Sequence, residues 1–146
     1  AAHALGALTP DGPVGNCAHS DMCCFSFHPV KPITTAEGGM VTTNDPALAE
    51  RLRLFRSHGI VRKPEQGAWY YEIAELGYHY RMTDIQAALG LSQMKRLDEF
   101  VKARHIIAAR YNDLLQEDWL QLPWQHSDTY SGFHLYIIRV KNNKKE

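Results

Sequence analysis

The segment CFSFHPVKPITTAEGGM, Cys24 to Met40, decides how this chain is interpreted. Its aromatic and small residues at the start indicate a short buried strand, and a second strand is expected at GGMVTTN. Lys31 lies between the two strands, beside prolines and ahead of Glu37-Gly38-Gly39, where glycine permits a tight turn. A lysine at a strand end among apolar side chains is partly removed from water, which favours its neutral, nucleophilic form. Because lysine is mostly exposed, the spacing alone still favours an ordinary surface loop.

The composition is that of one globular domain with no overall charge. The 146 residues include 16 basic and 16 acidic side chains, so there is no general attraction to nucleic acid or anionic membranes, and we expect neither partner. No apolar run approaches the roughly 20 residues that span a bilayer, and the first residues lack the regions of a signal peptide. These observations favour a cytoplasmic location. Any anion that binds must be held by a local site.

Helix and strand patterns alternate along the first half of the chain. Asp45 and Pro46 form a helix start, and the apolar periodicity that follows runs to a glycine stop at Gly59. Residues 60–81 lose that period and contain proline, glycine and several aromatic residues. We expect a long irregular segment there, of the kind that carries functional contacts.

The second half begins with a long helical pattern. The sequence TDIQ, Thr83 to Gln86, is a capping-box signature, and the apolar stripe after it continues to Leu115 with a bend expected near Asp98. The alternating pattern of residues 132–140, GFHLYIIRV, predicts a strand. The predicted fold class is α/β, with a boundary within residues 116–124.

Three blocks of sequence resemble one enzyme family. They are FSFHPVKPITTAEGGMVTTND around Lys31, FRSHGI from Phe55 to Ile60, and ELGYHYRMTDIQAALGLSQMKRLD from Glu75 to Asp98. In this order they resemble the DegT/DnrJ/StrS-type nucleotide-sugar aminotransferases, which use pyridoxal 5′-phosphate. The resemblance implies the aspartate-aminotransferase-like fold of type I. Residues 1–118 would be the C-terminal part of the cofactor-binding large domain with its linking helices, and residues 119–146 would begin the small domain.

The resemblance also implies a role for each of five residues. Lys31 matches the lysine that bonds covalently to the cofactor and later carries a proton between cofactor and sugar. Ser26 matches the hydroxyl that binds the cofactor phosphate, and His3 matches a position close to the cofactor ring. His79 or Arg81 occupies the segment that reaches into the partner subunit's site, and the sequence does not decide between them. The implied functional unit is therefore a homodimer with shared active sites.

The implied activity is transfer of an amino group, with glutamate as the donor, to a nucleotide-linked 4-keto-6-deoxy sugar in polysaccharide or glycan biosynthesis. The family's dehydratase branch has histidine in place of the cofactor lysine, so Lys31 argues against that branch. The resemblance places the acidic partner of the cofactor's ring nitrogen one residue before Ala1, and most of the small domain after Val140. We therefore expect a middle segment of a longer enzyme that is incomplete by itself. The alternative is an inactive truncated remnant with only a structural or oligomerisation role.

A metal site is the remaining chemical possibility. The chain has eight histidines and three cysteines, but they form no HExxH or CxxC motif and no close pair at ligand spacing. We therefore expect no metal.

Overall fold

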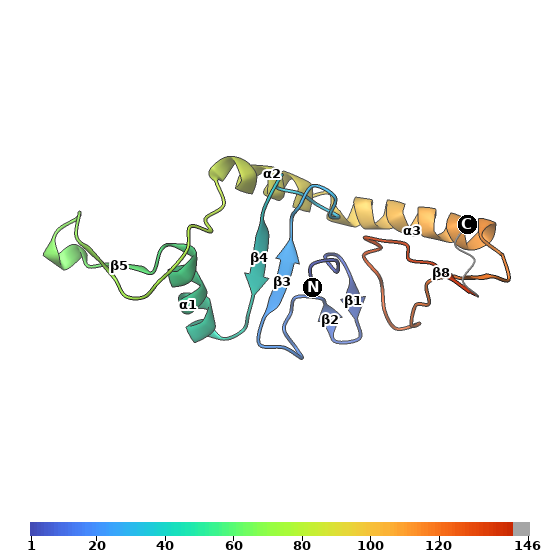
Figure 1. The fold of residues 1–146 in the computed structure, drawn as a ribbon, viewed down its shortest axis with the longest axis horizontal. Coiled ribbons are helices and arrows are strands. Elements are labelled where there is room, and N and C mark those ends of the chain that lie inside the picture. Colours follow the sequence, from blue (N-terminus) through green and yellow to red (C-terminus); the bar gives the residue numbers. More distant parts are fainter. Residues whose placement is uncertain (142–146) are drawn as a thin grey trace.

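The structure is a computed structural model that describes residues 1–141 (Figure 1). Residues 142–146, the end of the unit predicted over 119–146, lie outside the described residues. The helices are α1 (Pro46–Arg56), α2 (Asp84–Met94) and α3 (Leu97–Leu114), with a 3-10 turn, η1, at Pro64–Gln66. Among the described residues, no helix combines the length and apolar character that crossing a membrane requires.

The strands form antiparallel pairs. These are β1 (Leu8–Thr9) with β2 (Gly12–Pro13), β3 (Cys23–Ser26) with β4 (Gly39–Thr42), β5 (Ile60–Arg62) with β6 (Tyr71–Ile73), and β7 (Leu120–Gln121) with β8 (Arg139–Val140). The mixture of helices and strands confirms the predicted α/β class. Figure 1 shows α2 and α3 following one another along one side of the molecule, with β3, β4 and the N-terminal hairpin beneath them.

Residues 27–38, called the lysine loop below, join β3 to β4. Phe27 closes the loop: its carbonyl oxygen accepts hydrogen bonds from Thr34 Oγ1 and from the Thr35 backbone N–H, each at 3.0 Å. Ile33 and Thr35 point into the interior, and each is only 1% exposed. The loop is therefore anchored by burial and hydrogen bonds, which limits the positions open to Lys31.

The core lies where α3 packs on β3 and on the lysine loop. Its buried apolar side chains are Phe25, Phe27, Ile33, Leu97 and Val101. Helix α2 also packs on the loop through Gly90, where a Cβ atom would lie 2.8 Å from Thr35 Cγ2. Gln86 Nε2 donates to the Glu37 carbonyl oxygen at 3.2 Å. Both helices therefore hold the lysine loop.

The two predicted helix starts are confirmed. Asp45 Oδ1 accepts from the backbone N–H groups of Ala47 and Leu48, at 2.7 and 3.3 Å, and Pro46 is the first residue of α1. Thr83 and Gln86 form the full capping box of α2. Such bonds satisfy N–H groups that have no partner within the helix.

The predicted helix ends need correction. Helix α1 ends at Arg56, before the expected stop at Gly59, and the backbone N–H of Gly59 instead bonds the Leu54 carbonyl oxygen at 2.9 Å. The long helical stripe is two helices that meet at Lys95 and Arg96, rather than one helix with a bend near Asp98.

The prediction of irregular structure over residues 60–81 was wrong in part, because β5 and β6 form a hairpin there. Lys63 Nζ lies 2.6 Å from Glu72 Oε2, and the Tyr70 hydroxyl donates to Glu72 Oε1 at 3.1 Å. These bonds, the one from Lys63 first, hold the pKa of the Glu72 carboxyl below its ordinary value. The strands are only three residues long, too short to show an alternating pattern.

The strand predicted over residues 132–140 was also mostly wrong. Only Arg139–Val140 pairs with another strand, Leu120–Gln121. The preceding residues are held by side chains instead, since Arg104 Nη1 donates to the carbonyl oxygens of Phe133 and His134. The boundary predicted after residue 118 stays a prediction.

Candidate active site

Three segments that are far apart in the sequence meet at His134, which contacts both Lys31 and His3. The Lys31 backbone N–H donates to the His28 carbonyl oxygen at 3.0 Å, which turns the lysine loop directly after β3. Lys31 Nζ then lies 3.5 Å from His134 Nε2, in the segment that follows α3. The His134 ring contacts the His3 ring edge to face, with their centroids 4.5 Å apart. Two predicted site residues, Lys31 and His3, are thus both next to a histidine that the sequence did not identify.

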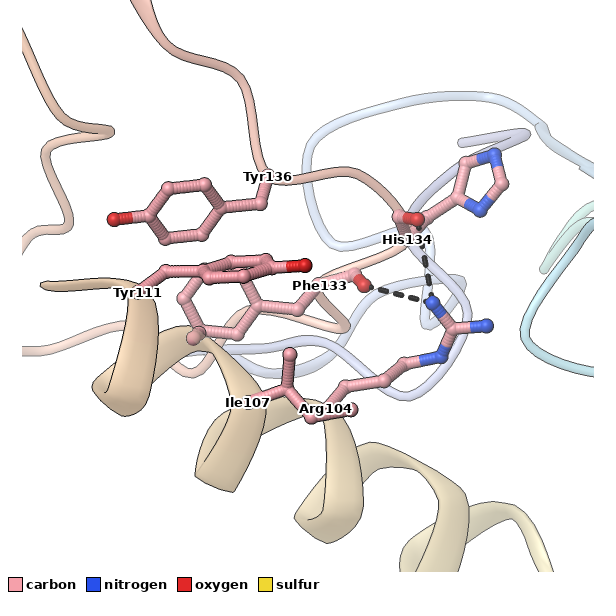
Figure 2. Close-up of a pocket in the computed structure, with 7 residues that line it drawn as sticks. Arg104, Ile107, Tyr111, Phe133, His134 and Tyr136 are labelled. Carbon is pink, nitrogen blue, oxygen red and sulfur yellow. Dashed lines mark hydrogen bonds between the residues drawn. The ribbon is translucent and has the colours of Figure 1, made fainter. Parts of the chain in front are cut away.

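Arg104 fixes the position of His134. Its Nη1 donates to the Phe133 carbonyl oxygen at 3.1 Å and to the His134 carbonyl oxygen at 3.3 Å (Figure 2). Arg104 and His134 border an open pocket of ≈ 200 Å³ on α3, which Tyr111 and Tyr136 also line. Figure 2 shows the His134 ring pointing away from these tyrosines. Because Arg104 of α3 holds the backbone on both sides of the imidazole, the ring of His134 faces Lys31.

The imidazole of His134 is an unusual group in two respects. Its Nδ1 atom is buried and has no hydrogen-bond partner among the described residues. Burial, and then the positive charges of Lys31, His3 and Arg104, lower the pKa of His134 below its ordinary value. Burial and the neighbouring positive charges therefore both favour the neutral form of the His134 ring.

His3, Lys31, Arg104 and His134 together are called the basic cluster below. Within residues 1–141, the ion pairs that the structure contains involve other residues, so no carboxylate pairs with a member of this cluster. Positive charge gathered without a counter-ion is unfavourable, and an anionic ligand would relieve it. A phosphorylated or carboxylated ligand therefore fits the cluster.

Ser26 lies at the end of β3, directly before the lysine loop. Its Oγ accepts a weak hydrogen bond from the His28 backbone N–H at 3.4 Å, and it lies opposite Gly39 in the β3–β4 ladder. Accepting this bond leaves the hydroxyl proton free to donate. A phosphate oxygen is a suitable acceptor for that proton.

His79 and Arg81 lie in a different place. Arg81 Nη2 bonds His79 Nε2 at 3.0 Å, and both side chains are exposed. His79 forms a β-bridge with Ser57, and its ring contacts the His58 ring with centroids 5.2 Å apart, at the end of α1. The described contacts of this pair are therefore with the end of α1 and not with the basic cluster. These contacts do not show whether His79 or Arg81 serves the shared active site.

Sequence reasoning missed His134 and Arg104. His134 is 103 positions from Lys31 and belongs to a block whose alternation predicted a strand, so no local spacing connects the two. Arg104 lies within a helical pattern where a charged residue is ordinary. Within residues 1–141, no three His, Cys, Asp or Glu side chains gather as metal ligands would.

Known proteins are similar to this chain in sequence and in fold. The chain is 46% identical over 139 residues to the UDP-4-amino-4,6-dideoxy-N-acetyl-beta-L-altrosamine transaminase of Campylobacter jejuni, and this match covers 94% of the chain and 36% of that protein. Among solved structures, Helicobacter pylori PseC, an aminotransferase involved in the biosynthesis of pseudoaminic acid, matches with a TM-score of 0.89 at 36% identity, over 97% of this chain and 37% of that one. The PLP-form of the putative sugar aminotransferase Spr1654 from Streptococcus pneumoniae matches with a TM-score of 0.85 at 34% identity, over 97% and 36%.

The chain therefore spans less than two fifths of the length of each of these relatives. The folds of the two solved structures agree with the predicted one, an aminotransferase fold of which this chain forms a part. The family model matches from the first residue to the last, residues 1–146. Together with the lysine loop and its sequence blocks, this match shows that the chain belongs to the DegT/DnrJ/EryC1/StrS aminotransferase family.

Proposed function

We propose that this chain is the lysine-bearing part of a pyridoxal-phosphate-dependent aminotransferase. The enzyme would transfer an amino group from glutamate to a nucleotide-linked 4-keto-6-deoxy sugar, for polysaccharide or glycan biosynthesis in the cytoplasm. The observation that carries the proposal is the position of Lys31: its loop is anchored in the core, and its amine lies in a basic cluster with no paired carboxylate among residues 1–141.

The residues present fit the cofactor. Lys31 Nζ would bond the cofactor's aldehyde carbon, the Ser26 hydroxyl would donate to its phosphate, and the basic cluster would offset its negative charge. His3 would lie beside the ring. When bound, pyridoxal phosphate supplies an electron sink for the carbon that gains or loses the amino group. The part of Lys31 is then to hold and release a proton at Nζ, for which its rigid loop provides a fixed starting position.

The names of two relatives support a proposal for the sugar substrate. The Campylobacter jejuni protein is named as a transaminase of UDP-4-amino-4,6-dideoxy-N-acetyl-beta-L-altrosamine, and a transaminase with this name in Helicobacter pylori is 41% identical over 116 residues. We propose a UDP-linked sugar of that class as the substrate. These names support the class of sugar, and they leave the stereochemistry to experiment.

We propose further that the enzyme is a homodimer. Large apolar side chains are exposed on and after the β5–β6 hairpin and at the start of α2, including Trp69 (77%), Leu76 (83%) and Ile85 (85%). Tyr78 and Tyr80 stack on each other beside His79, with ring centroids 4.9 Å apart, and both are exposed. Exposed apolar surface of this kind is typical of an interface. A subunit placed there would bring His79 or Arg81 to a shared site.

An amino-transfer assay on the complete encoded protein tests the activity. The protein is supplied with pyridoxal phosphate, glutamate and a UDP-linked 4-keto-6-deoxy sugar, and the amino sugar is detected by mass spectrometry. We expect product from the unaltered protein and from Lys102→Ala, an exposed lysine of α3, and none from Lys31→Ala. Equal turnover by Lys31→Ala would refute the role of Lys31. No turnover by the unaltered protein on any such sugar would favour the inactive-remnant alternative.

A further inference from the structure

The cysteines at the start of β3 lie on opposite faces of the strand. Cys23 and Cys24 are neighbours in extended backbone, so their side chains point in opposite directions. Cys23 is half-buried and packs against the apolar core, whereas Cys24 is exposed. Cys17 lies in the segment before β3 and is also half-buried. The two strand cysteines therefore have different surroundings.

Cys17 and Cys23 meet at Thr42 of β4. Thr42 is the residue directly opposite Cys23 in the β3–β4 ladder, so their side chains lie on the same face. The Sγ atom of Cys17 lies 3.3 Å from the Thr42 carbonyl oxygen and 3.6 Å from Thr42 Oγ1. The Cys17 side chain also hydrogen-bonds the Cys23 thiol. The fold therefore places these two thiols next to each other.

The segment that joins the two cysteines is fixed near both of its ends. Asn44 Nδ2 donates to the Asn16 carbonyl oxygen at 2.8 Å, and Thr43 Oγ1 donates to the Asp21 carbonyl oxygen at 2.7 Å. Cys17 has φ +55°, a left-handed conformation that is uncommon for cysteine and that its surroundings must maintain. The position of the Cys17 thiol is therefore set by the fold.

We propose that Cys17 and Cys23 form a reversible disulfide in exchange with a low-molecular-weight disulfide of the glutathione class, and that Cys24 takes no part. The Cys23 thiolate attacks one sulfur of glutathione disulfide, the S–S bond of that molecule breaks, and one glutathione thiolate leaves. The Cys17 thiolate then attacks the Cys23 sulfur of the mixed disulfide, and the second glutathione thiolate leaves. Two protein thiols are oxidised, one glutathione disulfide is reduced, and the two protons that the cysteines lose pass to the two glutathione thiolates.

The surroundings of Cys23 make it the thiol that attacks first. Ser20 Oγ lies 3.4 Å from Cys23 Sγ. The hydrogen bond from Ser20 has the largest effect and lowers the pKa of the Cys23 thiol; burial opposes it, and the bond from Cys17 adds to it. A lowered pKa increases the fraction of thiolate at neutral pH, and the thiolate is the nucleophile in this exchange.

The proposed disulfide lies outside the basic cluster, at the other end of β3 from the lysine loop. Cys23 is the first residue of β3 and Ser26 is the last. In the cytoplasmic location proposed above, glutathione keeps most thiols reduced, so a disulfide there is transient and responds to oxidation. The inference concerns a modification site and does not depend on the proposed amino transfer.

The first test maps the disulfide in the complete encoded protein. The protein is incubated with glutathione disulfide at neutral pH, its free thiols are blocked with N-ethylmaleimide, and it is digested with Asp-N protease. This protease cuts before Asp11 and Asp21, so it separates Cys17 from Cys23 and Cys24. We expect loss of two thiols, a Cys17–Cys23 link and maleimide on Cys24, and dithiothreitol should restore both thiols. Three unreacted thiols, a glutathione adduct that persists on Cys23, or a link from Cys17 to Cys24 would overturn the proposal.

The second test separates the two steps with single variants. Cys17→Ser cannot make the second attack, so one glutathione should remain on Cys23, whereas Cys23→Ser should form no link. The matched control Cys24→Ser should form the Cys17–Cys23 link as the unaltered protein does. Glutathione on Cys24 in place of Cys23 in the Cys17→Ser variant would contradict the proposed order.

Urea provides a control that needs no variant. In the unfolded protein the faces of β3 no longer exist, so Cys24 should also link to Cys17. The folded protein should give only the Cys17–Cys23 link. The same mixture of links in folded and unfolded protein would overturn the proposal, even where a variant fails to fold.

Discussion

Replacing Gly90 with alanine tests how tightly α2 holds the lysine loop. A Cβ atom at this position would lie 2.8 Å from Thr35 Cγ2, whereas carbon atoms in favourable contact are about 3.5–4.0 Å apart. Thr35 has no room to move away, because it is 1% exposed, β-branched, and bonded through Oγ1 to the Glu37 carbonyl oxygen at 2.7 Å. The substitution therefore overpacks the contact between the helix and the loop.

Two opposing effects set the size of the change. Overpacking of a buried contact costs about 1–3 kcal/mol, and alanine gains about 1 kcal/mol over glycine within a helix. We expect Gly90→Ala to lower the free energy of unfolding by about 1 kcal/mol. Thr35→Ser removes Cγ2 and keeps the hydroxyl, so it opens the space that the alanine methyl needs.

The assay is a double-mutant cycle by urea unfolding of the complete protein at one fixed protein concentration. The double variant should be more stable than the sum of the single changes predicts, by about 1–3 kcal/mol. Ser92→Ala, on an exposed face of α2, controls for helix propensity and should not couple to Thr35→Ser. If Gly90→Ala stabilises the protein and shows no coupling to Thr35→Ser, the packing argument is wrong.

Three further predictions concern other parts of the same framework. Thr83→Ala removes the capping box with Gln86 and should cost about 1 kcal/mol in urea unfolding, more than Ser92→Ala does. Because the pKa of His134 is lowered in the folded state, the unfolded chain binds more protons just below pH 6.5, so the free energy of unfolding should fall on acidification through that range. A His134→Gln variant should lose less of its free energy of unfolding over the same range, and an equal loss would show that His134 is not the cause. Gly59→Ala should prevent normal folding, since Gly59 has φ +67° and a Cβ would collide with the Glu75 carbonyl oxygen; circular dichroism unchanged from the unaltered protein would contradict this.

The sequence predicted local structure well wherever one short segment contains the whole cause. Asp45 with Pro46, and Thr83 with Gln86, start helices through bonds made within a few residues, and both starts are confirmed. The alternating run over residues 132–140 failed for the opposite reason. A strand exists only where a partner is available, and the partner of Arg139–Val140 lies at Leu120–Gln121.

The candidate site divides in the same way. Lys31 and Ser26 were found because they share one loop and one strand end, and the loop's blocks match a known family. His134 lies beside Lys31, and Arg104 holds the backbone of His134, only because α3 packs on β3 and the lysine loop, and no local pattern encodes that packing. The roles assigned to Lys31, Ser26, His3, His79 and Arg81 stay predictions.

The most direct test of the central claim is to identify the residue that bonds pyridoxal phosphate. The complete encoded protein is incubated with the cofactor, reduced with borohydride, digested, and mapped by mass spectrometry. A rigid, anchored loop with Lys31 in the basic cluster predicts one modified peptide, with the added cofactor mass on Lys31, and no such peptide in Lys31→Ala. A cofactor adduct on another lysine, or none at Lys31, would contradict the account.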